Sequence, residues 1–214
     1  MKLIDYTLKE FITNLDSASP APGGGSASAV ATTMGIALSR MVGHLTIPKK
    51  KFQKLDESIQ NEITEIHAAL KESKRRTLEL TDEDSEAFNG IMKALKMPKE
   101  TEMEKAQRTK ALQKASVRAT EAPLEIAREA NKALEKIKPI AKHGIKSAIS
   151  DIGVGALMLY AGLEGAVLNV RINLSGLDDE AFRKSCHEEA LSLLESGKRH
   201  RDEILAYVND AMDY

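Results

Sequence analysis

The chain has 214 residues, and its 31 Lys and Arg nearly cancel its 32 Asp and Glu, which leaves a formal net charge of −1. No overall field therefore favours nucleic acid or an anionic membrane surface. Tryptophan is absent and aromatic residues make up only 4%, whereas helix-favouring Ala, Leu, Glu and Lys dominate. The length suffices to bury a core without disulfides or metals, so we expect residues 1–214 to form a single domain.

No segment predicts export or a membrane anchor. The longest apolar run, 152–163, has twelve residues before Glu164, whereas a membrane-spanning helix needs about 20. The N-terminal stretch mixes acidic and basic residues and lacks an apolar signal core. The single Cys186 cannot form an internal disulfide, which fits a reducing compartment. We expect a soluble cytoplasmic protein with no membrane or nucleic-acid partner.

The spacing of apolar residues and breakers predicts a succession of helices. In chain order they cover 8–15, 27–45, 55–95, 101–139, 150–169 and 179–212, with a kink or break at Pro123. The fourth opens on a capping box, Thr101 to Glu104. No alternating strand pattern bounded by hairpin turns appears, and the β-branched piece at 169–173 is too isolated for a sheet. The fold class is all-α, a multihelical bundle of about six to seven helices.

The stretch SPAPGGGSAS, residues 19–28, differs most from the rest of the chain. Glycines before a helix allow backbone N–H groups to approach an anion, helped by the positive end of the helix. The run matches neither a Walker A sequence nor a dinucleotide-binding fingerprint. Two interpretations remain: a flexible loop, or the wall of a ligand site where side chains would obstruct the ligand.

Asp84 is unusual because of the face it occupies. Helical spacing places it on the same stripe as the following residues: Thr77, Leu80, Phe88, Ile91 and Leu95. A buried carboxylate is costly unless it is paired, hydrogen-bonded or protonated. Either the helix breaks near residues 81–82 and Asp84 caps a second helix, or its pocket tunes the carboxylate for acid–base chemistry.

Asp151 is the only charged residue between Lys146 and Glu164. It lies at the start of a segment that is apolar on all faces. One interpretation is that Ser150 or Asp151 is simply a helix N-cap, where an acidic group is favourable. The apolar segment itself predicts either a central helix or an oligomer interface.

Neither the histidines nor the lysine run gives a specific signal on its own. The five histidines show no metal-ligand spacing and no cysteine cluster accompanies them, so we expect no metal site. Lys49, Lys50 and Lys51 are interpreted as a solvated helix start or, alternatively, as a dock for a polyanionic tail.

Taken together and in order, four stretches resemble one family. They are SPAPGGGSASAVATTMGIALSRMV, LTIPKKKF, DSEAFNGIMKALKMPK and ISDIGVGALMLYAGLEGAVLNVRIN. This combination is similar to the cyclodeaminase/cyclohydrolase family of folate one-carbon enzymes. The resemblance implies an all-helical homodimer with the folate near a subunit interface, and no metal or cofactor beyond the tetrahydrofolate substrate. One departure is that Ile145 and Ser147 occupy positions where relatives often carry asparagine.

On this resemblance we expect hydrolysis of 5,10-methenyltetrahydrofolate to 10-formyltetrahydrofolate, with Asp84 as acid–base and Asp151 as its electrostatic partner. The alternatives are formiminotetrahydrofolate cyclodeaminase activity, which releases ammonia, and a non-enzymatic helical scaffold. Lys49 to Lys51 would attract the glutamate tail of the folate, whether it has one glutamate or several. The expected substrate-binding residues are Gly23, Gly24, Gly25, Ser26, Lys49, Lys50, Ser150, Asn169 and Asn173.

Overall fold

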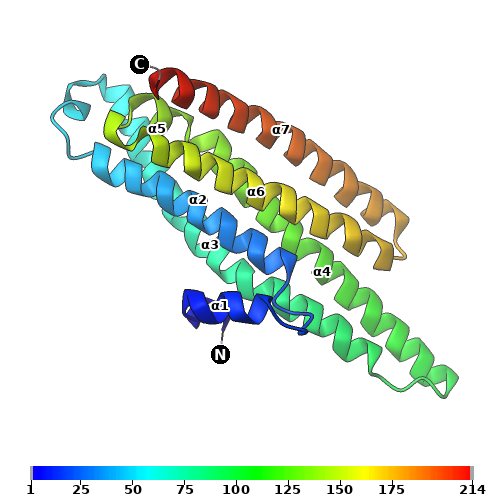
Figure 1. The fold of residues 1–214 in the computed structure, drawn as a ribbon. Coiled ribbons are helices and arrows are strands. Elements are labelled where there is room, and N and C mark those ends of the chain that lie inside the picture. Colours follow the sequence, from blue (N-terminus) through cyan, green and yellow to red (C-terminus); the bar gives the residue numbers. More distant parts are fainter. Residues whose placement is uncertain (1, 213–214) are drawn as a thin grey trace.

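The computed structural model describes residues 2–212, and over that range the chain is entirely helical with no strand. Figure 1 shows the arrangement of the seven α-helices. They are α1 (Leu8–Leu15), α2 (Gly24–Thr46), α3 (Glu57–Leu95), α4 (Glu102–Lys136), α5 (Lys138–His143), α6 (Ile149–Asn173) and α7 (Glu180–Met212). Four short 3-10 turns join them: η1 (Leu3–Asp5), η2 (Phe52–Lys54), η3 (Lys146–Ala148) and η4 (Leu174–Gly176). The predicted all-α fold is confirmed.

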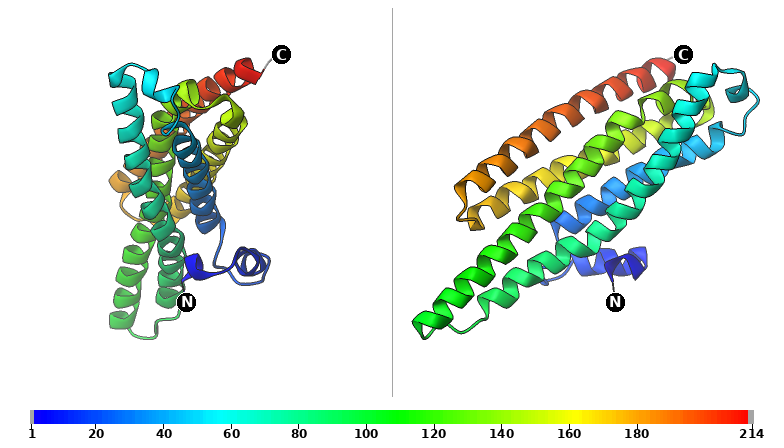
Figure 2. Two further views of the ribbon diagram at one scale, coloured as in Figure 1. Left: turned by 90° about the vertical axis from the view of Figure 1, so that its left-hand side faces the viewer. Right: turned by 180° about the vertical axis from the view of Figure 1, so that it is seen from behind.

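Five long helices form the bundle. α2 packs most extensively against α6, α4 lies against both α3 and α6, and α7 covers α6. The two views of Figure 2 place α2 and α6 on one side of the molecule and the α3–α4 hairpin on the other. The core lies between these layers and is built largely from Ile, Leu, Val and Ala side chains.

The close contact of α2 with α6 depends on small residues. A Cβ added at Gly162 would lie 2.2 Å from Thr32 Oγ1, so a larger residue would push the helices apart. Gly35 of α2 similarly faces Gly155 and Leu159 of α6. The two helices are antiparallel, because Gly24 lies against Asn169 and Ser39 lies close to Gly155.

Two sequence-based boundaries were wrong, both for reasons of tertiary context. α4 runs unbroken through Pro123, so the break that was predicted there as one alternative is wrong. α2 begins at Gly24 rather than residue 27, so two glycines of the run are helical and not part of a flexible loop. The β-branched piece at 169–173 is the last turn of α6.

Among residues 2–212, α6 is the one helix long and apolar enough to cross a membrane by length and composition. Its location explains this composition, because half of the apolar window is buried between α2, α4 and α7. The buried side includes Ile152, Leu159 and Leu163. α6 is therefore a core helix of the bundle, and its other side remains at the surface.

Candidate functional site

The start of α2 meets the middle of α3 at Asp84. The hydroxyl of Ser26, in the first turn of α2, donates to Asp84 Oδ2 at 3.1 Å and also contacts the Thr81 carbonyl oxygen at 2.9 Å. Because α3 is continuous from Glu57 to Leu95, Asp84 does not cap a second helix. The alternative of a break near residues 81–82 is thereby excluded.

The glycine run leaves room for the Asp84 carboxylate. A Cβ at Gly25 would lie 2.0 Å from Asp84 Oδ1 and 2.4 Å from its Cγ. A Cβ at Gly24 would lie 3.0 Å from the amide nitrogen of Asn169, whose side chain donates to the Gly165 carbonyl at 2.8 Å. Gly23 precedes the helix and has only ordinary space around it. Asp84, Ser26, Gly24, Gly25 and Asn169 therefore form one cluster.

Electrostatically, Asp84 caps α2 from a neighbouring helix. The N-cap residue Gly23 has no side chain to bond the first turn, and that turn contains no acidic residue of its own. A carboxylate at this position is favoured by the partial positive charge of the helix N-terminus. The group at the start of α2 is thus a carboxylate of the protein itself.

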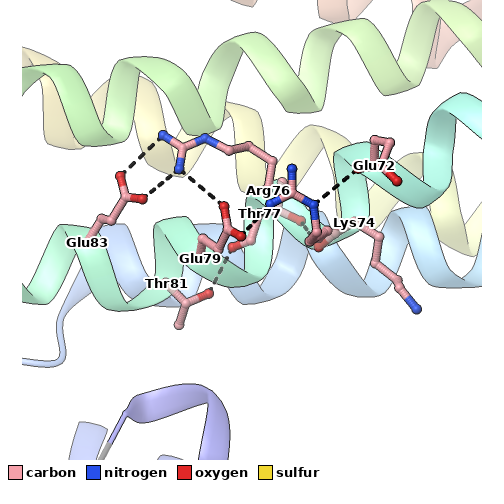
Figure 3. A network of polar contacts seen from close by, with 8 residues as sticks. Glu72, Lys74, Arg76, Thr77, Glu79, Thr81 and Glu83 are labelled. Atoms are coloured by element: carbon pink, nitrogen blue, oxygen red, sulfur yellow. Dashed lines mark hydrogen bonds and ion pairs between the residues drawn. The ribbon is translucent and has the colours of Figure 1, made fainter.

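Burial raises the pKa of Asp84 above its ordinary value, and hydrogen bonds from the side chain and backbone of Ser26 oppose this only in part. No cation forms an ion pair with Asp84 among residues 2–212. Arg76, eight residues before Asp84 in α3, binds Glu83 at 2.6 and 3.2 Å along the side of α3 that faces α4 (Figure 3). A carboxylate with a raised pKa and no cationic partner can exchange a proton nearer to neutral pH than an exposed one.

Asp151 lies at the opposite end of the bundle from this cluster. It occupies the first turn of α6, whose N-cap is Ala148, so neither Ser150 nor Asp151 serves as the N-cap. Asp151 precedes Asn169 by eighteen residues of α6, or about 27 Å along the helix axis. Within one chain the structure therefore does not bring Asp151 or the exposed Ser150 to Asp84.

The lysine run lies at the same end as Asp151. Lys49, Lys50 and Lys51 are exposed in the turns between α2 and η2, and do not start a long helix. Lys49 and Lys51 line a cavity of about 420 Å³, whose other lining residues include Phe52, Ile149 and Tyr207. Lys142, His143 and Lys146 also line it, but no carboxylate of the described residues does. No sequence pattern indicated this cavity, because its lining comes from segments far apart in the chain.

Asn173 has a structural partner instead of facing the Asp84 cluster. Its amide nitrogen donates to the carbonyl oxygen of Ala119 at 2.6 Å. Ala119 is four residues before Pro123, so its carbonyl is the one that Pro123, lacking an N–H, leaves without a helical donor. This bond explains why α4 continues through the proline.

Comparisons with known proteins give the family. The sequence profile described as Formiminotransferase-cyclodeaminase matches residues 7–192. The chain belongs to the formiminotransferase-cyclodeaminase family.

Relatives in this family carry two names. Methenyltetrahydrofolate cyclohydrolase of Methylorubrum extorquens is 39% identical over 189 residues, which are 88% of each chain. Formimidoyltransferase-cyclodeaminase of Gallus gallus is 37% identical over 204 residues, covering 95% of this chain but only 37% of that protein. The chain thus spans little more than a third of the bifunctional relatives it matches.

A solved structure agrees with the fold of this family member. Formiminotetrahydrofolate cyclodeaminase from Thermotoga maritima matches with a TM-score of 0.77 and 29% identity, over 97% of this chain and 96% of that one. The predicted membership of the cyclodeaminase/cyclohydrolase family is confirmed. Because this is a family of folate one-carbon enzymes, the scaffold alternative loses its support.

Proposed function

We propose that this protein is a methenyltetrahydrofolate cyclohydrolase, with Asp84 as the acid–base group. The observation that carries the proposal is the Asp84 carboxylate, held against the glycine start of α2 with a raised pKa and no cationic partner. The cyclohydrolase relative, which matches over 88% of both chains, supports this activity. The proposed cellular location is the cytoplasm.

The chemistry needs a base and a returning proton. Water adds to the bridging carbon of the cationic methenyl substrate, and ionised Asp84 accepts one water proton. The carbinolamine then collapses: the bond from that carbon to N5 breaks, Asp84 returns its proton to N5, and the hydroxyl proton leaves to solvent. The product is 10-formyltetrahydrofolate and one net proton. The negative carboxylate also stabilises the cationic substrate, so the proposal requires neither a metal nor a cofactor beyond the folate.

The other residues of the Asp84 cluster have positioning roles in this proposal. Ser26 orients the carboxylate through its hydroxyl, while Asn169 retains an amide oxygen that can accept from the substrate or from water. Gly25 leaves room for the carboxylate and Gly24 leaves room for the Asn169 amide, whereas Gly23 borders neither group. We assign no such positioning role to Asn173, because its amide nitrogen donates to the Ala119 carbonyl oxygen of α4.

We further propose that the working unit is a homodimer with a shared site. Seven large apolar side chains of α2 and α6, each at least 37% exposed, form what we name the α2–α6 band: Met34, Met41, Leu45, Val154, Leu157, Leu168 and Ile172. Several large apolar side chains exposed on two adjacent helices are typical of an interface. A two-fold axis through the middle of the band would place the partner subunit's Asp151, Ser150 and lysine run beside Asp84. The lysines would then receive the glutamate tail of the folate.

Formiminotetrahydrofolate cyclodeaminase activity is the second candidate. It is supported by the Thermotoga maritima structure, which bears that name and matches over nearly its whole length. The same Asp84 would accept the N10 proton as N10 attacks the carbon of the protonated formimino group. It would return that proton to the departing nitrogen, and the bond from the carbon to this nitrogen would break to release ammonia and the methenyl cation. Both reactions share the methenyl species, so one base at one position serves either.

The absorbance of methenyltetrahydrofolate tests the proposal. Purified enzyme should accelerate its loss above the uncatalysed rate, and Asp84→Asn should reduce kcat at least about 100-fold while the circular dichroism spectrum is unchanged. Appearance of the methenyl band from formiminotetrahydrofolate, with release of ammonia, would instead assign the cyclodeaminase reaction. A substantially active Asp84→Asn enzyme would overturn the role of Asp84 in both.

A further inference from the structure

The N-terminal arm, residues 2–22, carries a helix that is exposed on its apolar side. Among the described residues, α1 packs along none of the other six α-helices, and only η1 of the arm lies closely on α3. The backbone N–H of Leu3 donates to Asp82 Oδ1 and anchors the arm there. Within α1, Phe11 is buried, but Leu8 and Ile12 are 68% and 54% exposed.

The exposure of Leu8 and Ile12 is unusual for so short a helix. α1 has eight residues with a complete capping box between Thr7 and Glu10, yet isolated helices shorter than about 12 residues are marginal in water. A short helix is normally stabilised by packing its apolar face. Phe11 supplies part of this packing within the subunit, but Leu8 and Ile12 leave the rest of the apolar face exposed.

The direction of the arm indicates which surface that is. Figure 2 shows α1 standing out from the bundle on the side of α2 and α6, away from the α3–α4 hairpin. The α2–α6 band is exposed on these same two helices. Exposed apolar side chains are therefore found both on α1 and on the two helices beside which it stands.

We infer that α1 is an intersubunit arm that packs on the α2–α6 band of a second copy of this chain. α1 emerges next to the Gly24–Asn169 end of the α2–α6 pair. In an antiparallel pair of subunits it meets the other end of the band, near Met41 and Val154 of the partner subunit. The arm leads directly into the glycine run, so it also closes one side of the shared site. This inference rests on the homodimer proposed above and not on which folate reaction is catalysed.

Charge placed on the apolar face of the arm tests the inference. In the full-length protein, Leu8→Glu with Ile12→Glu should raise the dimer dissociation constant at least about tenfold in sedimentation equilibrium, since burial of one leucine is worth that much. The matched control is Thr13→Glu, which adds the same group to the exposed face of α1 that lacks apolar residues. It should leave the dissociation constant within about twofold of the wild type.

Cross-linking gives a second, independent measurement. Ile12→Cys combined with Val154→Cys should form a covalent dimer under mild oxidation, whereas Thr13→Cys with Val154→Cys should not; native Cys186 is buried. The wild-type protein could be dimeric while the two glutamate substitutions leave its dissociation constant unchanged and the cysteine pair gives no covalent dimer. That result would overturn the proposed role of α1 but not the shared site. A monomeric wild-type protein, including one that binds anionic vesicles through α1, would overturn both. An inactive but dimeric protein would overturn only the proposed reaction.

Discussion

At the scale of single residues, the carboxylate of Asp84 gives the physical reason for the glycine at position 25. The carboxylate occupies the volume in which a Cβ of residue 25 would lie, 2.0 Å from Oδ1. Removing that Cβ allows the carboxylate to reach the N-terminus of α2, where the helix dipole favours a negative charge. The glycine is needed for this close approach and not for a left-handed backbone, because the described residues contain no glycine with a positive φ.

Gly25→Ala is therefore expected to displace Asp84. We predict a loss of unfolding free energy of about 1–3 kcal/mol from overpacking and a fall in kcat of about 100-fold, because a shift of about 1 Å in a reacting group has that effect. Chemical denaturation and the methenyltetrahydrofolate absorbance assay measure the two quantities.

Gly90→Ala is the matched control, since Gly90 is also helical but has open space, with Ala115 Cβ the nearest atom at 3.8 Å. It should raise the unfolding free energy by about 0.5–1 kcal/mol, the usual gain from replacing a helical glycine, with unchanged kcat. If Gly25→Ala behaves like Gly90→Ala, the steric account of the glycine run is wrong.

At the scale of helices, α4 and α6 are joined by a polar contact that compensates for a proline. Pro123 removes one backbone donor from α4, and Asn173 of α6 supplies a substitute to the Ala119 carbonyl. Ala119 and Pro123 are both buried, so water is not an easy alternative partner. The continuity of α4 therefore depends on a residue 50 positions further along the chain.

We predict that Asn173→Ala lowers the unfolding free energy by about 1–3 kcal/mol, the cost of an unsatisfied buried acceptor. In a Pro123→Ala background, residue 123 regains its N–H, and the cost of Asn173→Ala should fall below about 1 kcal/mol. A double-mutant cycle measured by denaturation gives this coupling.

Kinetics separates this structural role from the substrate-binding role expected from sequence. Asn173→Ala should leave KM for the folate within about twofold at temperatures where the variant is folded. A large rise in KM together with additive stability effects would restore the substrate-binding role.

At the scale of the whole molecule, the candidate residues are divided between two ends of the bundle. Asp84, Ser26, Gly24, Gly25 and Asn169 lie at one end of the α2–α6 pair, while Asp151 lies about 27 Å away along α6. Both groups flank the exposed α2–α6 band. In the proposed dimer, a two-fold axis through this band brings one end of each subunit next to the opposite end of its partner. Both groups of residues then contribute to one site.

Mixing two inactive variants tests this arrangement. Asp84→Asn and Asp151→Asn homodimers should each lose activity, but subunit exchange should restore about a quarter of the wild-type value. Half of the dimers would then be hybrids, each with one intact and one doubly substituted site. The absorbance assay after exchange measures the recovery.

Activity that stays absent after verified subunit exchange would show that each site is built within one chain. An active Asp151→Asn homodimer would instead remove Asp151 from the site. Exchange is verified separately by tagging one variant and recovering the other with it.

By itself, the sequence determined the fold class and most helix positions, because apolar spacing and capping residues act over a few neighbouring positions. The resemblance of four sequence stretches indicated the family. The capping box at Thr101 and the inward position of Asp84 were predicted in this way, and the structure confirms both. Only the tertiary structure decided that α4 passes through Pro123, that the glycines are helical, and that Asp151 is remote from Asp84 within the chain. Each of these depends on a contact between distant segments: a donor from α6, a carboxylate from α3, and the antiparallel packing of α2 on α6. Local periodicity carries no information about such contacts, since it does not specify which helix faces which.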